Sequence, residues 1–160
     1  MSAIKKEPLI TDLIEEKILK TDEKIEFFGQ VDELSAFIME FVHYAEDKRL
    51  EMELRKIVKI LSVILAEVAG GYGHVGELHV KELEELILEY EQKVGPFREF
   101  VVPGETLMGA RVHILRTVSR RAERAYARVY EKFGGSDIIF AYLNDLSKLF
   151  FVIARSYDEK

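Results

Sequence analysis

Hydrophobic residues recur every three or four positions along most of the chain, which is the spacing of helices with one buried face. A further segment, from about 136 to 157, is apolar around nearly its whole circumference. Such a helix belongs in the centre of a bundle or between subunits. The four amphipathic segments run from about 31 to 47, 50 to 69, 78 to 93 and 105 to 133.

The breaks between these segments carry residues that end helices. Gly70-Gly71, Gly95-Pro96 and Gly134-Gly135 each follow a predicted helix. The run from Phe97 to Val102 is closed by Pro103-Gly104 and predicts an extended loop lying on the body. No segment alternates convincingly as a strand does, and the connections are short. The pattern predicts one all-α domain over residues 1–160, an up-and-down helical bundle.

The N-terminal segment shows weaker helical spacing. Its apolar residues fit a short amphipathic helix between Pro8 and about Lys20. The next predicted helix has Asp32 and Glu33 in its first turn, where the helix dipole favours anions. The apolar residues of the N-terminal segment are Leu9, Ile10, Leu13, Ile14 and Ile18.

Composition narrows the possible partners and compartments. The formal net charge is -6, which argues against general binding to nucleic acids or anionic membranes. The chain has no apolar run of membrane-spanning length and no N-terminal signal pattern, so we expect a cytoplasmic protein without membrane contact. It has no cysteine, which excludes disulfides and thiolate metal sites.

The nine residues from Arg116 to Arg124 include four arginines and one glutamate. Arg116, Arg120 and Arg124 form a row one helical turn apart, and guanidinium groups in such a row suit a polyphosphate or a row of carboxylates. A solvated face or salt bridges between subunits would explain the same pattern. The residues by themselves leave these alternatives open.

Other motifs carry less weight. The sequence from Gly71 to Gly76 satisfies GxGxxG, but it follows a helix rather than a strand, so we interpret it as a helix-ending loop. There is no P-loop, and the histidines are scattered outside metal-binding motifs, so no metal site formed by the protein is predicted. These histidines are His43, His74, His79 and His113.

Asn144 stands alone on the most apolar helix, where a buried amide must find hydrogen-bond partners. Ser147, Phe151 and Arg155 share its face at helical spacing and would form a polar seam. Both a structural hydrogen bond and a ligand contact fit this position.

Several blocks, in this order, resemble the PduO-type ATP:cob(I)alamin adenosyltransferases. The resemblance spans roughly Lys20 to Arg155 and is most specific in the arginine block and the Tyr142-Leu143-Asn144 block downstream. The matching blocks are residues 28–36, 100–104, 112–113 with 116–124, and 142–144 with 146–147 and 149–155.

The resemblance implies a five-helix bundle with a ferritin-like four-helix core plus one helix, assembled as a homotrimer with active sites between subunits. Members of this family transfer the 5'-deoxyadenosyl group of ATP to the cobalt of reduced cobalamin and release triphosphate. ATP, cobalamin and Mg²⁺ are the implied cofactors. A corrinoid reductase or an adenosylcobalamin-dependent enzyme is an implied partner.

The resemblance also assigns roles to single residues. Phe100 is expected to fill the lower face of the corrin, and with Arg120 it is the implied catalytic residue. Arg116 is expected to pair with Asp32 across the subunit boundary. Glu123 would fix the arginine cluster or help to place Mg²⁺. The implied ATP-binding residues are Lys20, Arg120, Arg121, Glu123, Arg124 and Asn144.

The chain departs from the family most clearly in residues 1–20. Family members carry a threonine- and glycine-rich loop that wraps the ATP phosphates, whereas residues 8–16 here are apolar and acidic, with no glycine before Gly29. Asp145 and Lys148 invert a charge pair but keep its spacing. A non-catalytic trimeric relative that binds corrinoid or nucleotide, or only assembles, is the alternative function. Nucleic-acid binding by the arginine segment is disfavoured by the acidic charge of the whole chain.

Overall fold

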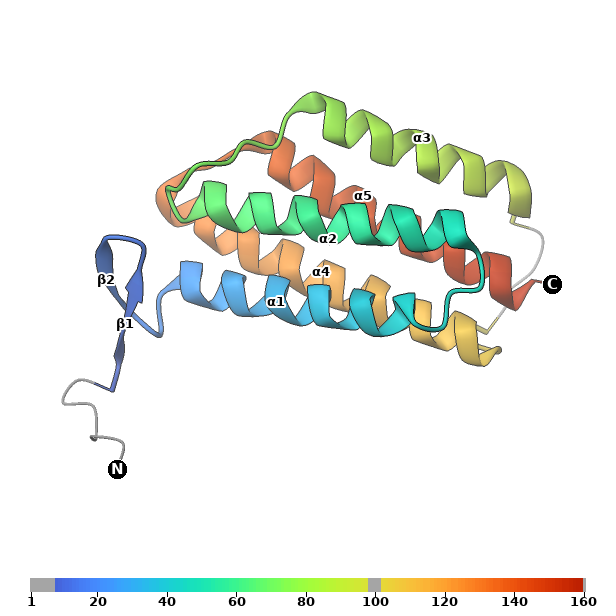
Figure 1. Ribbon diagram of the computed structural model, residues 1–160, viewed down its shortest axis with the longest axis horizontal. Helices are drawn as coiled ribbons and strands as arrows, with labels where there is room; N and C mark the ends of the chain where they lie inside the picture. Colours follow the sequence, from blue (N-terminus) through green and yellow to red (C-terminus); the bar gives the residue numbers. More distant parts are fainter. Residues whose placement is uncertain (1–7, 98–101, 160) are drawn as a thin grey trace.

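The computed structural model describes residues 8–97 and 102–159, and within these residues five helices form an up-and-down bundle (Figure 1). Helix α4 packs against both α1 and α5, while α2 lies against α1 and α3 against α5. The predicted bundle of five main helices is confirmed. The helices are α1 (Glu23–Val42), α2 (Lys48–Val68), α3 (Glu77–Val94), α4 (Leu107–Phe133) and α5 (Asp137–Asp158).

Side-chain caps fix where α1, α2 and α4 begin. The Asp47 carboxylate accepts the Arg49 amide at 2.8 Å, and the Thr106 hydroxyl accepts the Gly109 amide at 3.0 Å. Helix α1 begins at Glu23, eight residues before the predicted start, because Asp22 caps it through the Lys24 amide at 2.9 Å. The first turn therefore holds Glu23 and Glu26, and the placement of Asp32 and Glu33 in the first turn was wrong.

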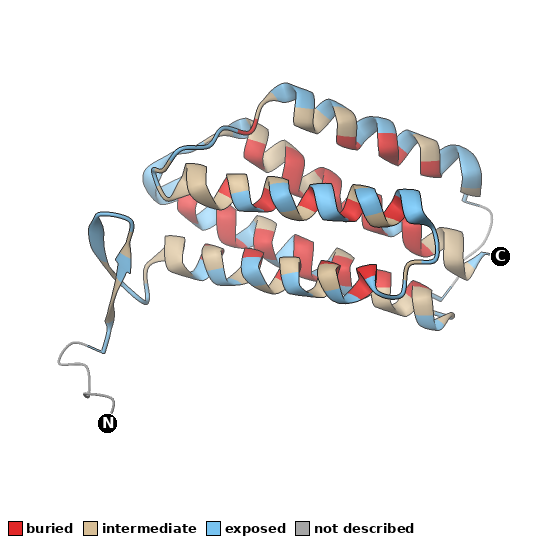
Figure 2. Ribbon diagram, viewed as in Figure 1, coloured by how far each residue is buried: buried red, intermediate tan, exposed pale blue. Residues whose placement is uncertain are grey.

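The core lies between the inner faces of the helices, where Figure 2 shows the buried residues gathered in stripes. Helix α5 is buried around much of its circumference, as its apolar sequence predicted, because it packs between α3 and α4. The largest fully buried side chains are Tyr126, Phe27, Phe41, Phe150, Leu34, Ile38, Leu54, Leu61, Ile64, Leu115, Ile139 and Leu143.

The N-terminal segment is a β-hairpin, so the predicted helix between residues 8 and 20 was wrong. Strands β1 (Ile10–Leu13) and β2 (Glu16–Leu19) pair antiparallel, with Ile10 opposite Leu19. Figure 1 shows the hairpin projecting beyond the start of α1, away from the inner faces of the helices. A short isolated helix there would be marginal, and strand pairing satisfies the backbone groups instead.

The hairpin turns through a strained residue. Ile14 has a positive φ of 53°, which is costly for a β-branched side chain, since Cβ meets the following carbonyl. We expect Ile14→Gly to stabilise the hairpin by up to about 1 kcal/mol. Slower amide hydrogen exchange in β1 and β2 would show this gain. Ile14→Val keeps the branched Cβ and should give no such slowing, and equal effects of both variants would contradict the strain.

Candidate functional site

Two arginines on the outer face of α4 have no counter-charge within the described chain. Val112, Leu115 and Ala122 bury the opposite face of α4, which leaves Arg120 and Arg124 exposed. Neither guanidinium makes an ion pair or hydrogen bond with residues 8–97 or 102–159. Like charges one helical turn apart repel each other. This pair therefore favours an anion that bridges the two side chains.

Arg121 points to the other side of α4, towards α1. Its Nε donates to Gln30 Oε1 at 2.7 Å, and its Nη2 donates to the Glu33 carboxylate. Its planar fork is therefore engaged by α1. Of the three arginines predicted to hold phosphate, Arg121 is the one that would have to exchange bonds to do so.

Arg116 is half-buried one turn before Arg120, and its Nε donates to His113 Nδ1 at 3.1 Å. Its predicted partner Asp32 is exposed on α1 and forms no ion pair with any residue that the structure describes. Arg116 and Asp32 are thus not paired within one chain. The proposed contact between them would require two copies.

Asn144 lies on α5 at the level of the arginine segment of α4. The rings of Tyr126 and Phe140 stand 4.8 Å apart between their centroids, and α4 and α5 run antiparallel (Figure 1). Asn144, one turn after Phe140, is therefore level with the turn of α4 that holds Glu123. The side-chain amide of the half-buried Asn144 makes no hydrogen bond with a described side chain or backbone group. It remains available to a ligand.

The predicted polar seam on α5 is divided between several local contacts. Ser147 is buried and donates to the Asn144 carbonyl at 2.9 Å. Arg155 turns away, donating to Glu159 at 2.9 Å and to the Gly95 carbonyl at 3.2 Å. Asn144 is therefore the member of the seam that is left for a ligand contact.

A lysine adds positive charge next to Asn144. Lys148, one turn further along α5, donates to the buried Asp145 at 2.9 Å, as the retained spacing of the pair predicted. This hydrogen bond raises the pKa of Lys148, and Glu84 and Glu123 add smaller electrostatic contributions. Glu123 thus lies close enough to α5 to interact with its charges.

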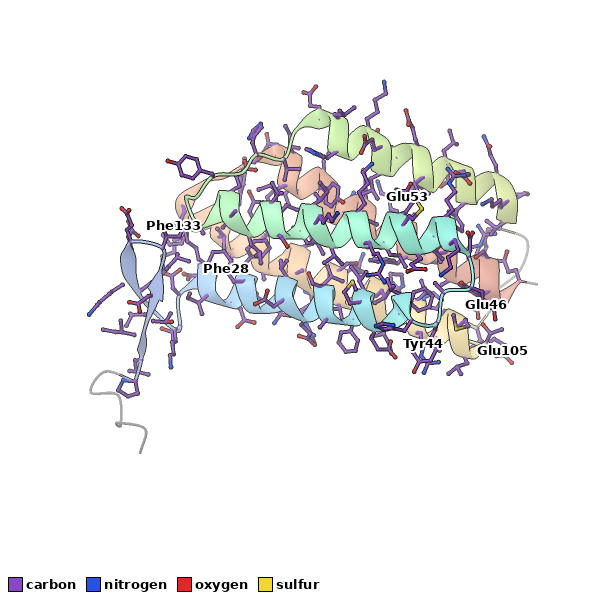
Figure 3. The ribbon with its side chains drawn as sticks, viewed as in Figure 1. Phe28, Tyr44, Glu46, Glu53, Glu105 and Phe133 are labelled. Carbon is purple, nitrogen blue, oxygen red and sulfur yellow. The ribbon has the colours of Figure 1, made fainter. Side chains whose placement is uncertain are left out.

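Of the remaining predicted residues, Lys20 lies at the end of the bundle that carries the hairpin. Lys20 is exposed after β2, next to the start of α1, where Lys132 of α4 pairs with Glu23 at 2.7 Å. Figure 3 shows Phe28 and Phe133 near this hairpin end of the bundle. Lys132 is eight positions after Arg124 on the same helix, a rise of about 12 Å. Phe100 lies outside the described residues.

The other motifs behave as structural elements. Residues Gly71 to Gly76 form the predicted loop after α2, where a Cβ on Gly73 would lie 3.2 Å from the Val63 carbonyl oxygen. Within residues 8–97 and 102–159, no three His, Asp or Glu side chains gather as a metal site would require. In the same part of the chain, each helix is too short or too polar to cross a bilayer.

Asp158 is the main residue that the sequence did not indicate. Its buried carboxylate, on the last residue of α5, accepts the amides of Gly104 at 3.0 Å and Thr106 at 2.9 Å and the Thr106 hydroxyl at 2.8 Å. Burial acts to raise its pKa, but these hydrogen bonds and nearby His113 outweigh burial, and the pKa lies below its ordinary value. Nothing local in the sequence marks Asp158 as the partner of Thr106.

Comparison with known proteins places this geometry in a family. The family model for cobalamin adenosyltransferases matches residues 10–157. A corrinoid adenosyltransferase of Citrobacter freundii is 34% identical over 148 residues, covering 87% of this chain and 83% of the relative. A cobalamin adenosyltransferase of Cupriavidus metallidurans is 30% identical over 144 residues, covering 87% and 77%. The chain spans 45% of the corrinoid adenosyltransferase PduO of Salmonella typhimurium, with 27% identity.

The fold agrees with the sequence comparison. A variant of the PduO-type ATP:corrinoid adenosyltransferase from Lactobacillus reuteri, solved in complex with cobalamin and ATP, superposes with a TM-score of 0.87. The two chains are 25% identical, and the match covers 98% of this chain and 94% of the other. Because the family model matches nearly the whole of this chain, the chain belongs to the PduO-type cobalamin adenosyltransferases, a family of enzymes.

Proposed function

We propose that this protein transfers the 5'-deoxyadenosyl group of ATP to the cobalt of reduced cobalamin and releases triphosphate. The observation that carries the proposal is that Arg120 and Arg124 have no partner among the described residues, and that the side-chain amide of Asn144, level with this part of α4, has none among them either. A row of guanidinium groups matches the oxygens of a triphosphate, and a single amide beside it can fix the nucleoside.

The reaction makes one bond and breaks one. The electron pair of cobalt(I) forms a bond to C5' of ATP. The bond between C5' and its oxygen breaks, and the triphosphate leaves with the electron pair of that broken bond. An electron donor, such as a corrinoid reductase, must first reduce the cobalt of cobalamin to cobalt(I). The protein's task is to align the two substrates and to stabilise the charge that develops on the leaving group. Arg120 and Arg124 supply the positive charge that stabilises the negative charge of the leaving triphosphate.

The other residues extend this phosphate site. Lys20 would reach the triphosphate from the hairpin end, while Arg121 would contribute only after exchanging its bonds to Gln30 and Glu33. Mg²⁺ usually binds through substrate phosphates and one or two carboxylates. Glu123 is the carboxylate placed to help, because it belongs to the same turn of α4 as Arg124.

We place the site at the boundary between subunits of a homotrimer. Exposed Ile114 and Phe151 lie on the outer faces of α4 and α5, and a second copy would cover them. Asp32 of one copy would then meet Arg116 of the next. Phe100 would face the corrin there, since its segment ends at Gly104, next to the start of α4.

A non-catalytic relative is the second candidate, and a specific feature favours it. Residues 8–19 contain no glycine, and the hairpin turns at Ile14. Asp12, Glu15 and Glu16 add negative charge to the hairpin. Backbone donors in a glycine-rich loop are a common way to hold phosphates. A trimer that kept the arginine face without this loop would bind nucleotide or corrinoid weakly, or only assemble.

Calorimetric titration with MgATP separates the two candidates. The enzyme proposal predicts one ATP site per chain, with magnesium triphosphate competing for it and adenosine alone binding much more weakly. Each titration should be paired with a mass measurement of the oligomer. If an intact oligomer gives no binding heat with MgATP, the non-catalytic alternative replaces the proposal.

A further inference from the structure

The first turn of α4 is tied to the last turn of α5 by Asp158, whose side chain is 3% exposed. Besides its three hydrogen bonds to Gly104 and Thr106, this carboxylate packs directly on Gly109, where a Cβ would overlap it. Glu105, which lies between the two anchored residues, sits at the end of the bundle opposite the hairpin (Figure 3). The chain that follows Phe100 is therefore fixed to the bundle four residues later, at Gly104.

The contacts of Asp158 with Gly104, Thr106 and Gly109 form a clamp between α5 and the start of α4. His113 connects this clamp to Arg116 in the arginine row. Its Nε2 lies 3.6 Å from Asp158 Oδ2, and its Nδ1 accepts the Nε hydrogen of Arg116 at 3.1 Å. An arginine has no acceptor, so Nδ1 must be unprotonated. The ring is thus neutral, with its hydrogen on Nε2 facing the carboxylate. The contacts determine one tautomer.

The surroundings of His113 favour this neutral form. Burial lowers the pKa of the imidazole, the Arg116 cation lowers it further, and Asp158 opposes them. From α5, His113 faces the Asp158 carboxylate and the Phe151 ring, whose centroid is 6.5 Å away; from its own helix it faces Arg116. Protonating Nδ1 would place two N–H groups opposite each other, and Arg116 would lose its acceptor.

We propose that His113 is a positioning residue that orients Arg116 for its contact across the subunit boundary. The inference rests on the proposed function. With Nε held by His113, the two Nη groups of Arg116 remain as a fork that matches the two oxygens of a carboxylate. Arg116 lies one turn closer than Arg120 to the start of α4, which Phe100 precedes in the sequence, so a misdirected fork should disturb the corrinoid more than the nucleotide.

Two variants separate the two contacts of His113. His113→Asn places an amide oxygen near the position of Nδ1 and keeps an acceptor for Arg116. His113→Gln places its amide near the position of Nε2, which keeps the contact with Asp158 and loses that acceptor. We expect His113→Gln to raise the KM for reduced cobalamin about tenfold, with kcat and the KM for ATP nearly unchanged. His113→Asn should stay close to the wild type.

A role limited to packing or to the clamp predicts a different pattern. His113→Gln would then equal or surpass His113→Asn, because it retains the contact with Asp158, and that result would overturn the inference. A loss of kcat equal to the change in KM would overturn it as well.

A spectroscopic measurement tests the inference without turnover. Ring ¹⁵N chemical shifts of His113 should show a protonated Nε2, an unprotonated Nδ1 and a pKa below the ordinary histidine value of 6.5. Arg116→Gln should raise that pKa, because it removes a neighbouring cation. A protonated Nδ1, or no response to Arg116→Gln, would refute the inference. The expected spectra from a protein without transferase activity would refute only the proposed function.

Discussion

Replacing Arg120 or Arg124 with alanine will weaken MgATP binding roughly 10- to 100-fold, because each variant removes charge-assisted hydrogen bonds to phosphate. The folded protein should tolerate the change, since both guanidinium groups are exposed and make no contact with a described partner. Calorimetric titration measures the loss in affinity, and thermal unfolding without ligand should show little change in stability.

Arg128 supplies the matched control for this prediction. It is exposed on the same helix, one turn beyond Arg124, and it also forms no ion pair with the residues that the structure describes. Arg128→Ala removes the same charge and should leave the affinity for MgATP nearly unchanged. An equal loss of affinity in the control would mean that the general charge of α4, rather than a built site, attracts the nucleotide.

Gly109→Ala will destabilise the protein by roughly 2–4 kcal/mol, because the added Cβ displaces Asp158 and breaks the hydrogen bonds that hold the start of α4. This loss of stability is the opposite of the usual effect, since alanine normally stabilises a helix interior by about 0.5–1 kcal/mol relative to glycine. Denaturant unfolding at one fixed protein concentration measures the difference.

Gly29→Ala is the control for this substitution. Gly29 lies within α1, and a Cβ there would meet no atom within 4 Å. This variant should raise the free energy of unfolding by about 0.5–1 kcal/mol. If Gly109→Ala gave a similar gain, the contact between Asp158 and α4 would not exist in solution.

The five main helices could be predicted because each carries a repeating apolar face, which is local information. The hairpin could not, since Leu9, Ile10, Leu13, Ile14 and Ile18 fit a helical spacing and the turn at Ile14 lacks the glycine or asparagine that usually marks it. Helix α1 begins earlier than predicted because the Asp22 cap precedes its apolar stripe, and Gly29 does not interrupt the helix.

The site shows the same division between local and distant information. The sequence indicated the row of Arg116, Arg120 and Arg124 because one helix sets their spacing. It did not indicate that Arg121 binds Glu33, 88 positions away, or that Asp158 holds Thr106, 52 positions away. Such contacts arise only when α1, α4 and α5 pack together, so they became visible with the fold.

The central claim is that this chain transfers an adenosyl group, and turnover tests it most directly. Chemically reduced cobalamin is mixed with the protein and MgATP without oxygen, and the absorption spectrum and the released triphosphate are followed together. We predict the adenosylcobalamin spectrum, one triphosphate for each cobalamin converted, and a much slower reaction with Arg120→Ala. An intact oligomer that leaves the spectrum unchanged and releases no triphosphate would contradict the account.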